Sequence, residues 1–373
     1  MPKSYFRCMF IITLIVGVSM FLVNKGVAES KDADSETQKS SEPGCLSSVF
    51  TKSLHFTGEG MRYWYEEKGG FMDITGIPYD ELDCKTCHVR SCDKCHARES
   101  GGRSYFSEHK TKSMNTCLPC HGREKLTFKF DGEKGHVDVH TGAGMVCADC
   151  HHNTDVHGDG KFRRSMRSPG AIQADCEKCH IDQCQPSPAF DTKIESHQVH
   201  NGKLDCAACH VSNTTACLNC HFGKFLETGK RPGNFIPIKK WTLLINYEGQ
   251  VTSGSAMTLV HENKKFLAYV PYYTHSILSE GRKCDDCHMN KAVQTIMNGD
   301  TVNMLAYEDG EVKHWQGAVP VRPDDLYWEF FNKTEDGGWT PVPNDDDPQI
   351  QFAAFGKPLT DAQFNKLTMD FSK

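Results

Sequence analysis

The sequence is short of apolar residues for its length. It has 373 residues, enough for two domains or one large one, but hydrophobic side chains make up only 38% of them. Through most of the middle of the chain no long helical or strand period appears. This composition does not support a core of packed aliphatic side chains alone, so another apolar filling is needed.

Basic clusters are also lacking. The formal net charge is −6, and no stripe of lysine and arginine has the spacing of a nucleic-acid-binding surface. This excludes nucleic acid as the expected partner. The weak excess of acid is compatible with steering toward basic patches on other proteins.

The apolar run near the amino terminus is too short for a membrane span. The run Met9–Val23 has 15 residues, and a spanning helix needs about 20. Basic Lys3 and Arg7 precede this run, and the small residues Val27-Ala28 follow it. We therefore predict a secretory signal peptide over 1–28 and export to the periplasm or the outer cell surface. The alternative is an uncleaved anchor.

Residues 29–44 are polar and charged, with no apolar period, and predict a disordered linker.

Cysteine and histidine are unusually abundant, with 19 residues of each. Cys45 and Cys184 are the two cysteines of the mature chain outside the motifs described next. In an oxidising compartment they could form a disulfide, a pairing that the sequence leaves open.

Sixteen cysteines fall into eight C-x-x-C-H motifs, where composition alone predicts roughly 0.05 copies in the chain. In this motif the two thiols form thioethers to a haem and the histidine binds its iron. Zinc ribbons, the alternative, do not explain a histidine after every pair. We predict eight haem c groups, whose apolar porphyrins supply the missing core. The motifs are Cys84/Cys87/His88, Cys92/Cys95/His96, Cys117/Cys120/His121, Cys147/Cys150/His151, Cys176/Cys179/His180, Cys206/Cys209/His210, Cys217/Cys220/His221 and Cys284/Cys287/His288.

The stretch 84–96 holds the first two motifs with only three residues between them. Three residues span at most about 10 Å, so the two haems are expected to be neighbours, which favours electron transfer. The motif starts at 117, 147, 176 and 206 are spaced by 30, 29 and 30 residues. This spacing indicates a loose repeat with one haem per unit.

A second histidine on each iron would leave an electron carrier, whereas an empty face could bind substrate. Eleven histidines lie outside the motifs, so eight bis-histidine haems are arithmetically possible. Met114, Met145 and Met166 are possible substitutes. By context we predict that the distal iron ligands come from His55, His140, His157, His197, His200 and His275, with His109, His136 and His152 as weaker candidates.

Three stretches carry a family resemblance: 54–88, 144–160 (GMVCADCHHNTDVHGDG), and KLDCAACH followed by ACLNCHF in 203–222. They resemble exported multihaem cytochromes of anaerobic, respiring bacteria, whose wider relatives are octahaem cytochromes of the tetrathionate reductase and hydroxylamine oxidoreductase type. The resemblance covers about 54–292. It implies that the six favoured distal histidines occupy ligand positions.

One departure from this family bears on function. The tetrathionate reductase type attaches its active-site haem through C-x-x-C-K, whereas all eight motifs here end in histidine. The crosslinking tyrosine of hydroxylamine oxidoreductases cannot be assigned either. The recognisable mark of an enzyme in this family is therefore absent from the sequence.

The predicted fold is a multihaem cytochrome c of short helices and irregular loops around eight haems. A seven-haem domain spans 45–224. Residues 225–373 hold a small antiparallel β-meander near 237–273, the eighth haem and a wrapping tail. The tail ends in a helix near 361–371, with Thr360 as its N-cap and Gln363 completing a capping box.

The predicted function is electron relay through mostly bis-histidine haems, in anaerobic respiration or extracellular electron transfer. Its partners would be other redox proteins, such as cytochromes and membrane quinol-linked donors. Two alternatives stay open. One is a reductase of a small nitrogen or sulfur oxyanion with one open iron, and the other is a self-associating subunit of a cytochrome filament.

Overall fold

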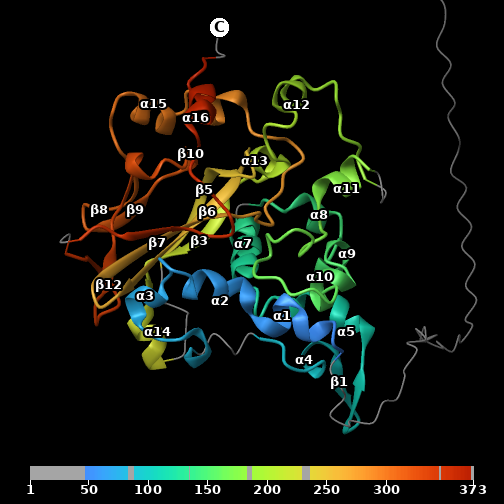
Figure 1. Ribbon diagram of the computed structural model, residues 1–373. Coiled ribbons are helices and arrows are strands. Elements are labelled where there is room, and N and C mark those ends of the chain that lie inside the picture. The colour runs from blue at the N-terminus through green and yellow to red at the C-terminus, as the bar shows by residue number, and fades with distance from the viewer. Residues whose placement is uncertain are drawn as a thin grey trace, which may run out of the picture. The chain divides into compact units, whose positions relative to one another are not determined.

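A computed structural model of the chain describes residues 47–82, 88–133, 135–182, 187–228, 236–343 and 346–370 (Figure 1). The predicted signal peptide and linker lie outside these ranges, as do Cys45, Cys184 and the first attachment pair, Cys84 and Cys87. Within these ranges, no helix has both the length and the apolar character needed to cross a membrane.

The helices are short. The α-helices are α1 (Leu54–Thr57), α2 (Glu59–Glu66), α3 (Met72–Thr75), α4 (Asp93–His96), α5 (Glu108–Lys112), α6 (Met114–Cys117), α7 (Gly122–Gly132), α8 (Val139–Gly142), α9 (Cys147–Cys150), α10 (Asn153–His157), α11 (Cys176–His180), α12 (Glu195–His200), α13 (Cys206–His210), α14 (Phe222–Thr228), α15 (Lys291–Met297) and α16 (Asp361–Leu367). The 3-10 turns are η1 (Phe50–Lys52), η2 (Tyr79–Glu81), η4 (Cys284–Asp286) and η5 (Pro323–Asp325).

The strands concentrate in the second half of the chain. They are β1 (Ala97–Ser100), β2 (Arg103–Phe106), β3 (Thr214–Leu218), β4 (Cys220–His221), β5 (Ile236–Tyr247), β6 (Gln250–His261), β7 (Lys264–Pro271), β8 (Val302–Glu308), β9 (Glu311–His314), β10 (Gly317–Pro320), β11 (Leu326–Trp328), β12 (Phe331–Lys333), β13 (Trp339–Pro341) and β14 (Gln349–Phe352).

The range 237–273, where we predicted a meander, holds the antiparallel strands β5, β6 and β7. Both connections are two-residue turns. Glu248-Gly249 and Glu262-Asn263 have positive φ at both positions, the geometry that matches the twist of the flanking strands. His261 ends β6 at the second of these turns.

The meander is the centre of a seven-stranded sheet. Strands β10 and β14 add in parallel to β5 and β7, while β3 pairs with β5 and β4 with β6. Strands β3 and β4 precede residue 225, so the sheet crosses the boundary we predicted between the haem domain and the β-containing segment. The division into domains stays a prediction.

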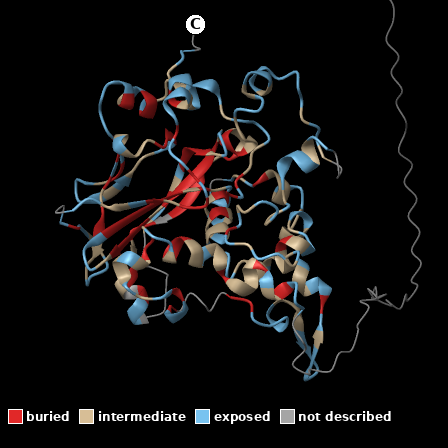
Figure 2. Ribbon diagram, in the orientation of Figure 1, coloured by how far each residue is buried: buried red, intermediate tan, exposed pale blue. Residues whose placement is uncertain are grey.

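The buried apolar residues gather on this sheet, as Figure 2 shows along β5, β6 and β7. Trp241, Leu243, Ile245 and Tyr269 are at most 1% exposed. The helices that carry the motifs are mostly half-buried or exposed in the same view. The conventional core therefore belongs to the sheet, and the motif region has little core of its own.

The aromatic stretch before the first motif packs on the sheet. Trp64, Tyr65 and Phe71 share a cluster with Phe222 and Phe266, and Phe71 is fully buried. This cluster fastens α2 and α3 to β7 and α14, which lie together in Figure 1.

The last helix, α16, begins after Thr360, whose side chain accepts from the Gln363 amide while the Gln363 side chain accepts from the Thr360 amide. The predicted capping box is confirmed. The helix buries Phe364 against the sheet core.

Candidate functional site

Six of the motifs form helical turns. In each of the four motifs that begin at Cys92, Cys117, Cys147 and Cys284, the histidine amide donates to the carbonyl of the first cysteine at 2.7–3.1 Å. The motifs that begin at Cys176 and Cys206 lie within α11 and α13. A helical turn places residues i, i+3 and i+4 on one face, so both thiols and the imidazole project from the same side, as a covalent haem requires.

The seventh motif is different, because Cys217 lies on β3 and Cys220-His221 forms β4. Leu218 and Asn219 between them are fully buried. The side chains of Cys217 and His221 are outside what the structure describes. A haem site here would be built on the sheet rather than on a helical turn.

Five of the described attachment cysteines are exposed on the polypeptide: Cys92, Cys120, Cys150, Cys176 and Cys284. They lie on helices and turns of only a few residues. An exposed thiol is accessible to a haem vinyl group, and the thioether role of these cysteines stays a prediction.

Six motif histidines each lie beside one histidine from elsewhere in the described chain. The ring centroids are 6.0–6.2 Å apart in all six cases. The pairs are His96 with His157, His121 with His55, His151 with His275, His180 with His140, His210 with His197, and His288 with His200.

This separation fits a shared iron. Two imidazole nitrogens, each about 2 Å from one metal, place their ring centroids roughly 6 Å apart. Direct packing of two small rings would allow closer distances, as between Phe190 and His197 at 4.4 Å. The same spacing at six places therefore fits haem iron held between two histidines.

Exposed apolar side chains in the motif region fit haem as well. Large apolar residues that are 46–56% exposed occur along residues 106–199; they are Phe106, Val137, Phe162, Met166, Ile181, Ile194 and Val199. Porphyrin faces would cover such surface.

Short helices present the second histidine of five pairs, whereas His275 follows β7 outside any helix. Ser53 caps α1, which carries His55, and Asp138 caps α8, which carries His140. Helix α12 carries both His197 and His200, which face two different motif histidines. Helix α12 therefore supplies the second histidine to two neighbouring sites.

Burial lowers the pKa of His55 and of His275 below the ordinary histidine value, with nearby histidines adding to the effect for His55. Burial also lowers the pKa of His96 and His288. These rings are therefore held neutral, which is the form that binds a metal. His140 differs, because the carboxylate of Asp138 raises its pKa.

Interactions between cysteines of different motifs indicate which of the six sites are neighbours. The thiols of Cys117 and Cys147 are in hydrogen-bonding contact, and Cys95 is within electrostatic range of Cys117. Further along, Cys150 interacts with Cys179, Cys176 contacts Cys206, and Cys209 interacts with Cys284 and Cys287. Among the described cysteines, these neighbours link the six sites in sequence order, from Cys92 to His288, as a single file that does not include the motifs of His88 and His221.

Three predicted distal histidines are not seen beside a motif histidine in the described residues. His109 and His152 are exposed. His136 is half-buried, and its Nε2 has no hydrogen-bond partner. Their assignment as iron ligands stays a prediction.

His88 of the first motif has a different neighbour. Its Nε2 lies 3.1 Å from the Tyr79 hydroxyl, and both residues are buried. The ring also rests on Gly58, where a Cβ would come within 2.2 Å of Nε2. No histidine ring contacts it within the described ranges. Because an iron would need about 4 Å between its two ligand atoms, this arrangement does not fit the pairing seen at the other six motifs.

Carboxylates beside the histidines were missed by the sequence analysis. Asp155 Oδ2, on α10, lies 3.3 Å from the Nδ1 of His151, four residues earlier in the chain, and Asp138 Oδ1 lies 3.6 Å from His140 Nδ1. Burial would raise the pKa of Asp138, but hydrogen bonds from His140, Ile277 and Thr141 outweigh it and lower the pKa to about 2. The spacing of His151 and Asp155 could have suggested the first of these contacts.

Comparisons with known proteins give one distant similarity. Dissimilatory sulfite reductase MccA of Wolinella succinogenes is 22% identical over 177 residues, which is 39% of this chain and 24% of the relative. The chain thus spans about a quarter of the length of that protein. No family model and no solved structure matches the chain. With the motifs and the histidine pairs, this similarity supports a multihaem cytochrome.

Proposed function

We propose that this chain is an exported c-type cytochrome that relays electrons one at a time through eight covalently attached haems. The six histidine pairs, at 6.0–6.2 Å between ring centroids, carry the proposal. A second histidine on an iron leaves no position for substrate. Each bound haem supplies a one-electron couple, and the chain supplies spacing, orientation and burial.

The single file of attachment cysteines favours the passage of electrons from site to site over the storage of electrons at separate sites. Consecutive sites touch through their thiols at Cys117–Cys147 and Cys176–Cys206. Haems attached at these positions would be neighbours. Such a file has two ends, one near the first motif and one near Cys284, and these ends are the proposed docking points for redox proteins, including quinol-linked donors at a membrane.

The spin states of the irons test this function. In protein purified from a host that attaches haem c, mass spectrometry should give eight haems. Electron paramagnetic resonance and resonance Raman spectra should give at least six low-spin, six-coordinate irons, because six motif histidines have a second histidine in place. A majority of high-spin irons would refute the relay.

A second function, reduction of a small sulfur or nitrogen oxyanion, is favoured by the lack of a second histidine beside His88 in the described residues. This motif histidine has a phenol rather than an imidazole beside its Nε2. Arg62, bound to Asp80, places its guanidinium over the Tyr79 ring at 5.3 Å. The similarity to a sulfite reductase points the same way.

The variant Tyr79→Phe separates the two functions. If the first motif holds an open iron, the wild type has a high-spin signal that shifts with sulfite or nitrite, and loss of the Tyr79 hydroxyl should alter that shift while the low-spin signals stay unchanged. Tyr65→Phe is the matched control, since Tyr65 lies in the same cluster but donates to the Ile77 carbonyl instead. A wild type without any high-spin iron would exclude the reductase.

A further inference from the structure

In ten of the twelve paired histidines Nδ1, the second ring nitrogen, has a partner of its own. An iron ligand's outer hydrogen bond fixes the ring and tunes how strongly it donates electrons to the metal. For six rings Nδ1 faces a backbone carbonyl at 2.7–3.1 Å: His55 with Val156, His180 with Pro188, His197 with Asp191, His200 with Ser196, His210 with Leu278 and His288 with Lys366. A carbonyl is a dipole and adds no net charge.

Carboxylates replace carbonyls at two sites. At the site of Cys147/Cys150, Asp155 Oδ2 lies 3.3 Å from His151 Nδ1, and Glu124 Oε1 lies 4.0 Å from the Nδ1 of the facing His275. At the next site, Asp138 Oδ1 lies 3.6 Å from His140 Nδ1. These two sites are consecutive, because Cys150 and Cys179 interact. They are the third and fourth of the six in the file.

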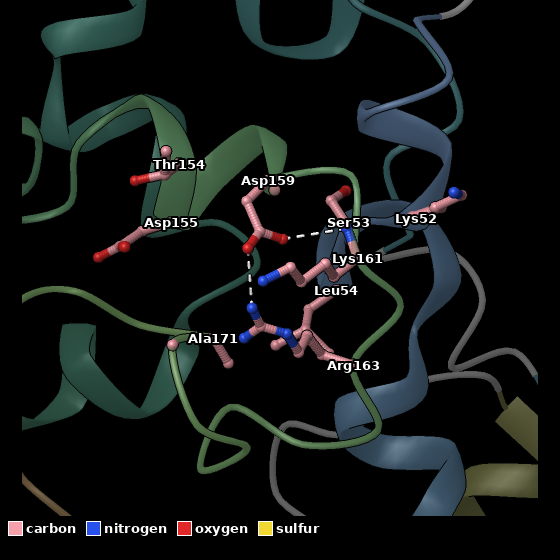
Figure 3. A pocket seen from close by; sticks show the side chains of 11 residues that line it. Lys52, Ser53, Leu54, Thr154, Asp155, Asp159, Lys161, Arg163 and Ala171 are labelled. Carbon is pink, nitrogen blue, oxygen red and sulfur yellow. Dashed lines mark hydrogen bonds and ion pairs between the residues drawn. The ribbon is translucent and has the colours of Figure 1, made fainter.

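The two aspartates are buried and held in place. Asp155 is 7% exposed and accepts from the amides of Gln173 and Ala174 at 2.7 and 3.3 Å. It belongs to α10, where it lies beside Thr154 and close to the Asp159–Arg163 ion pair (Figure 3). Backbone donors fix the position of the carboxylate, so its charge cannot swing away from His151.

Asp138 is 3% exposed and links two ligand segments. It accepts from the amides of His140 and Thr141 on α8, and from the amide of Ile277, two residues after His275. One carboxylate therefore lies between the segments that present the second histidines of both central sites. Glu124 is held by a hydrogen bond from Tyr272.

A fixed negative charge beside an iron ligand favours the more positive oxidation state of the metal. The effect is strong where water is excluded, because the effective dielectric constant is low. A carboxylate on Nδ1 also makes the imidazole a stronger donor. Both effects stabilise ferric over ferrous haem.

We propose that Asp155, Glu124 and Asp138 hold the reduction potentials of the two central haems below those of the four flanking paired haems. This inference rests on the proposed electron relay. Electrons would then reside at the two ends of the file and cross the centre only transiently. The cytochrome would present two electron pools joined by a low-potential bridge.

The variant Asp155→Asn tests the inference in the haem-loaded protein by potentiometric titration followed optically and by electron paramagnetic resonance. Removal of the charge should raise the ferrous-to-ferric ratio of one haem about tenfold at a fixed potential, which is 59 mV for a one-electron couple. The component that moves should be among the last to be reduced in the wild type. Glu124→Gln should move the same component in the same direction.

The variant Asp159→Asn is the matched control. It removes one carboxylate four residues along the chain, but Asp159 is exposed and pairs with Arg163 rather than with a histidine. It should leave every component in place. If Asp155→Asn also moves none, or moves one of the first components to be reduced, the inference fails. The low-spin count of the same samples would still stand, so this failure is distinct from failure of the relay.

Discussion

Replacing His275 with alanine is expected to convert one low-spin haem to high spin and to slow electron passage between the two ends of the file. His275 faces His151 at 6.2 Å between ring centroids, at the third of six consecutive sites. Its loss leaves the haem attached through Cys147 and Cys150 but with one axial ligand. Among the six described sites, this is the one whose cysteines neighbour both the second site and the fourth.

Two measurements check this prediction. Electron paramagnetic resonance should show one new high-spin signal and one fewer low-spin signal. Fast photoreduction at one end, followed by optical detection of the slower redistribution, should give a rate at least about tenfold below wild type, since altered ligation changes both potential and reorganisation.

His152→Ala is the control for His275→Ala. His152 adjoins the same motif histidine, His151, but is exposed and is not seen beside any motif histidine in the described chain. It should leave both spectrum and rate unchanged. If His152→Ala gives the high-spin signal and His275→Ala does not, the pairing of His275 with His151 is wrong.

The sequence predicted the motif histidines because the C-x-x-C-H pattern is local. Six of the nine predicted distal histidines also lie beside a motif histidine. Their positions follow from local cues, such as His140 shortly before Cys147 and His197 one helical turn from His200. Short-range spacing was enough to select them as candidates, and their role as iron ligands stays a prediction.

Which histidine meets which motif could not be predicted. His140 precedes Cys147 by seven residues but pairs with His180, and His55 reaches past two motifs to His121. These pairings depend on tertiary contacts, such as the hydrogen bond that the distant Ile277 amide donates to Asp138. Local spacing contains no information about such contacts.

Part of the sheet could likewise be predicted from the sequence, and part could not. Strands β5, β6 and β7 could be predicted, because alternating apolar stretches are separated by Glu248-Gly249 and Glu262-Asn263 turns. The additions of β3 and β14 join residues 27 and 83 positions apart, at the pairs Thr214–Trp241 and Gln349–Phe266. The burial of the early aromatics on this sheet is likewise a long-range contact.

The largest effect is expected when the haems are withheld. In a chain made without haem attachment, amides of residues 92–210 should exchange with solvent roughly a thousandfold faster or more, as for a loss of about 4 kcal/mol of local stability. Helices α4, α8, α9, α11, α12 and α13 have only 4 to 6 residues, whereas isolated helices below about 12–15 residues are marginal in water. Hydrogen exchange with mass spectrometry measures both forms.

The sheet should behave in the opposite way. Trp241, Leu243, Ile245 and Tyr269 are packed against protein alone and are at most 1% exposed, so residues 236–271 should stay protected without haem. Trp241→Ala in the haem-loaded protein is the reciprocal control, because a cavity of this size costs about 3–5 kcal/mol and should loosen the sheet first. If the haem-free chain protects 92–210 as well as the loaded protein does, the porphyrins are not the core of that region, and the low apolar content of the sequence needs another explanation.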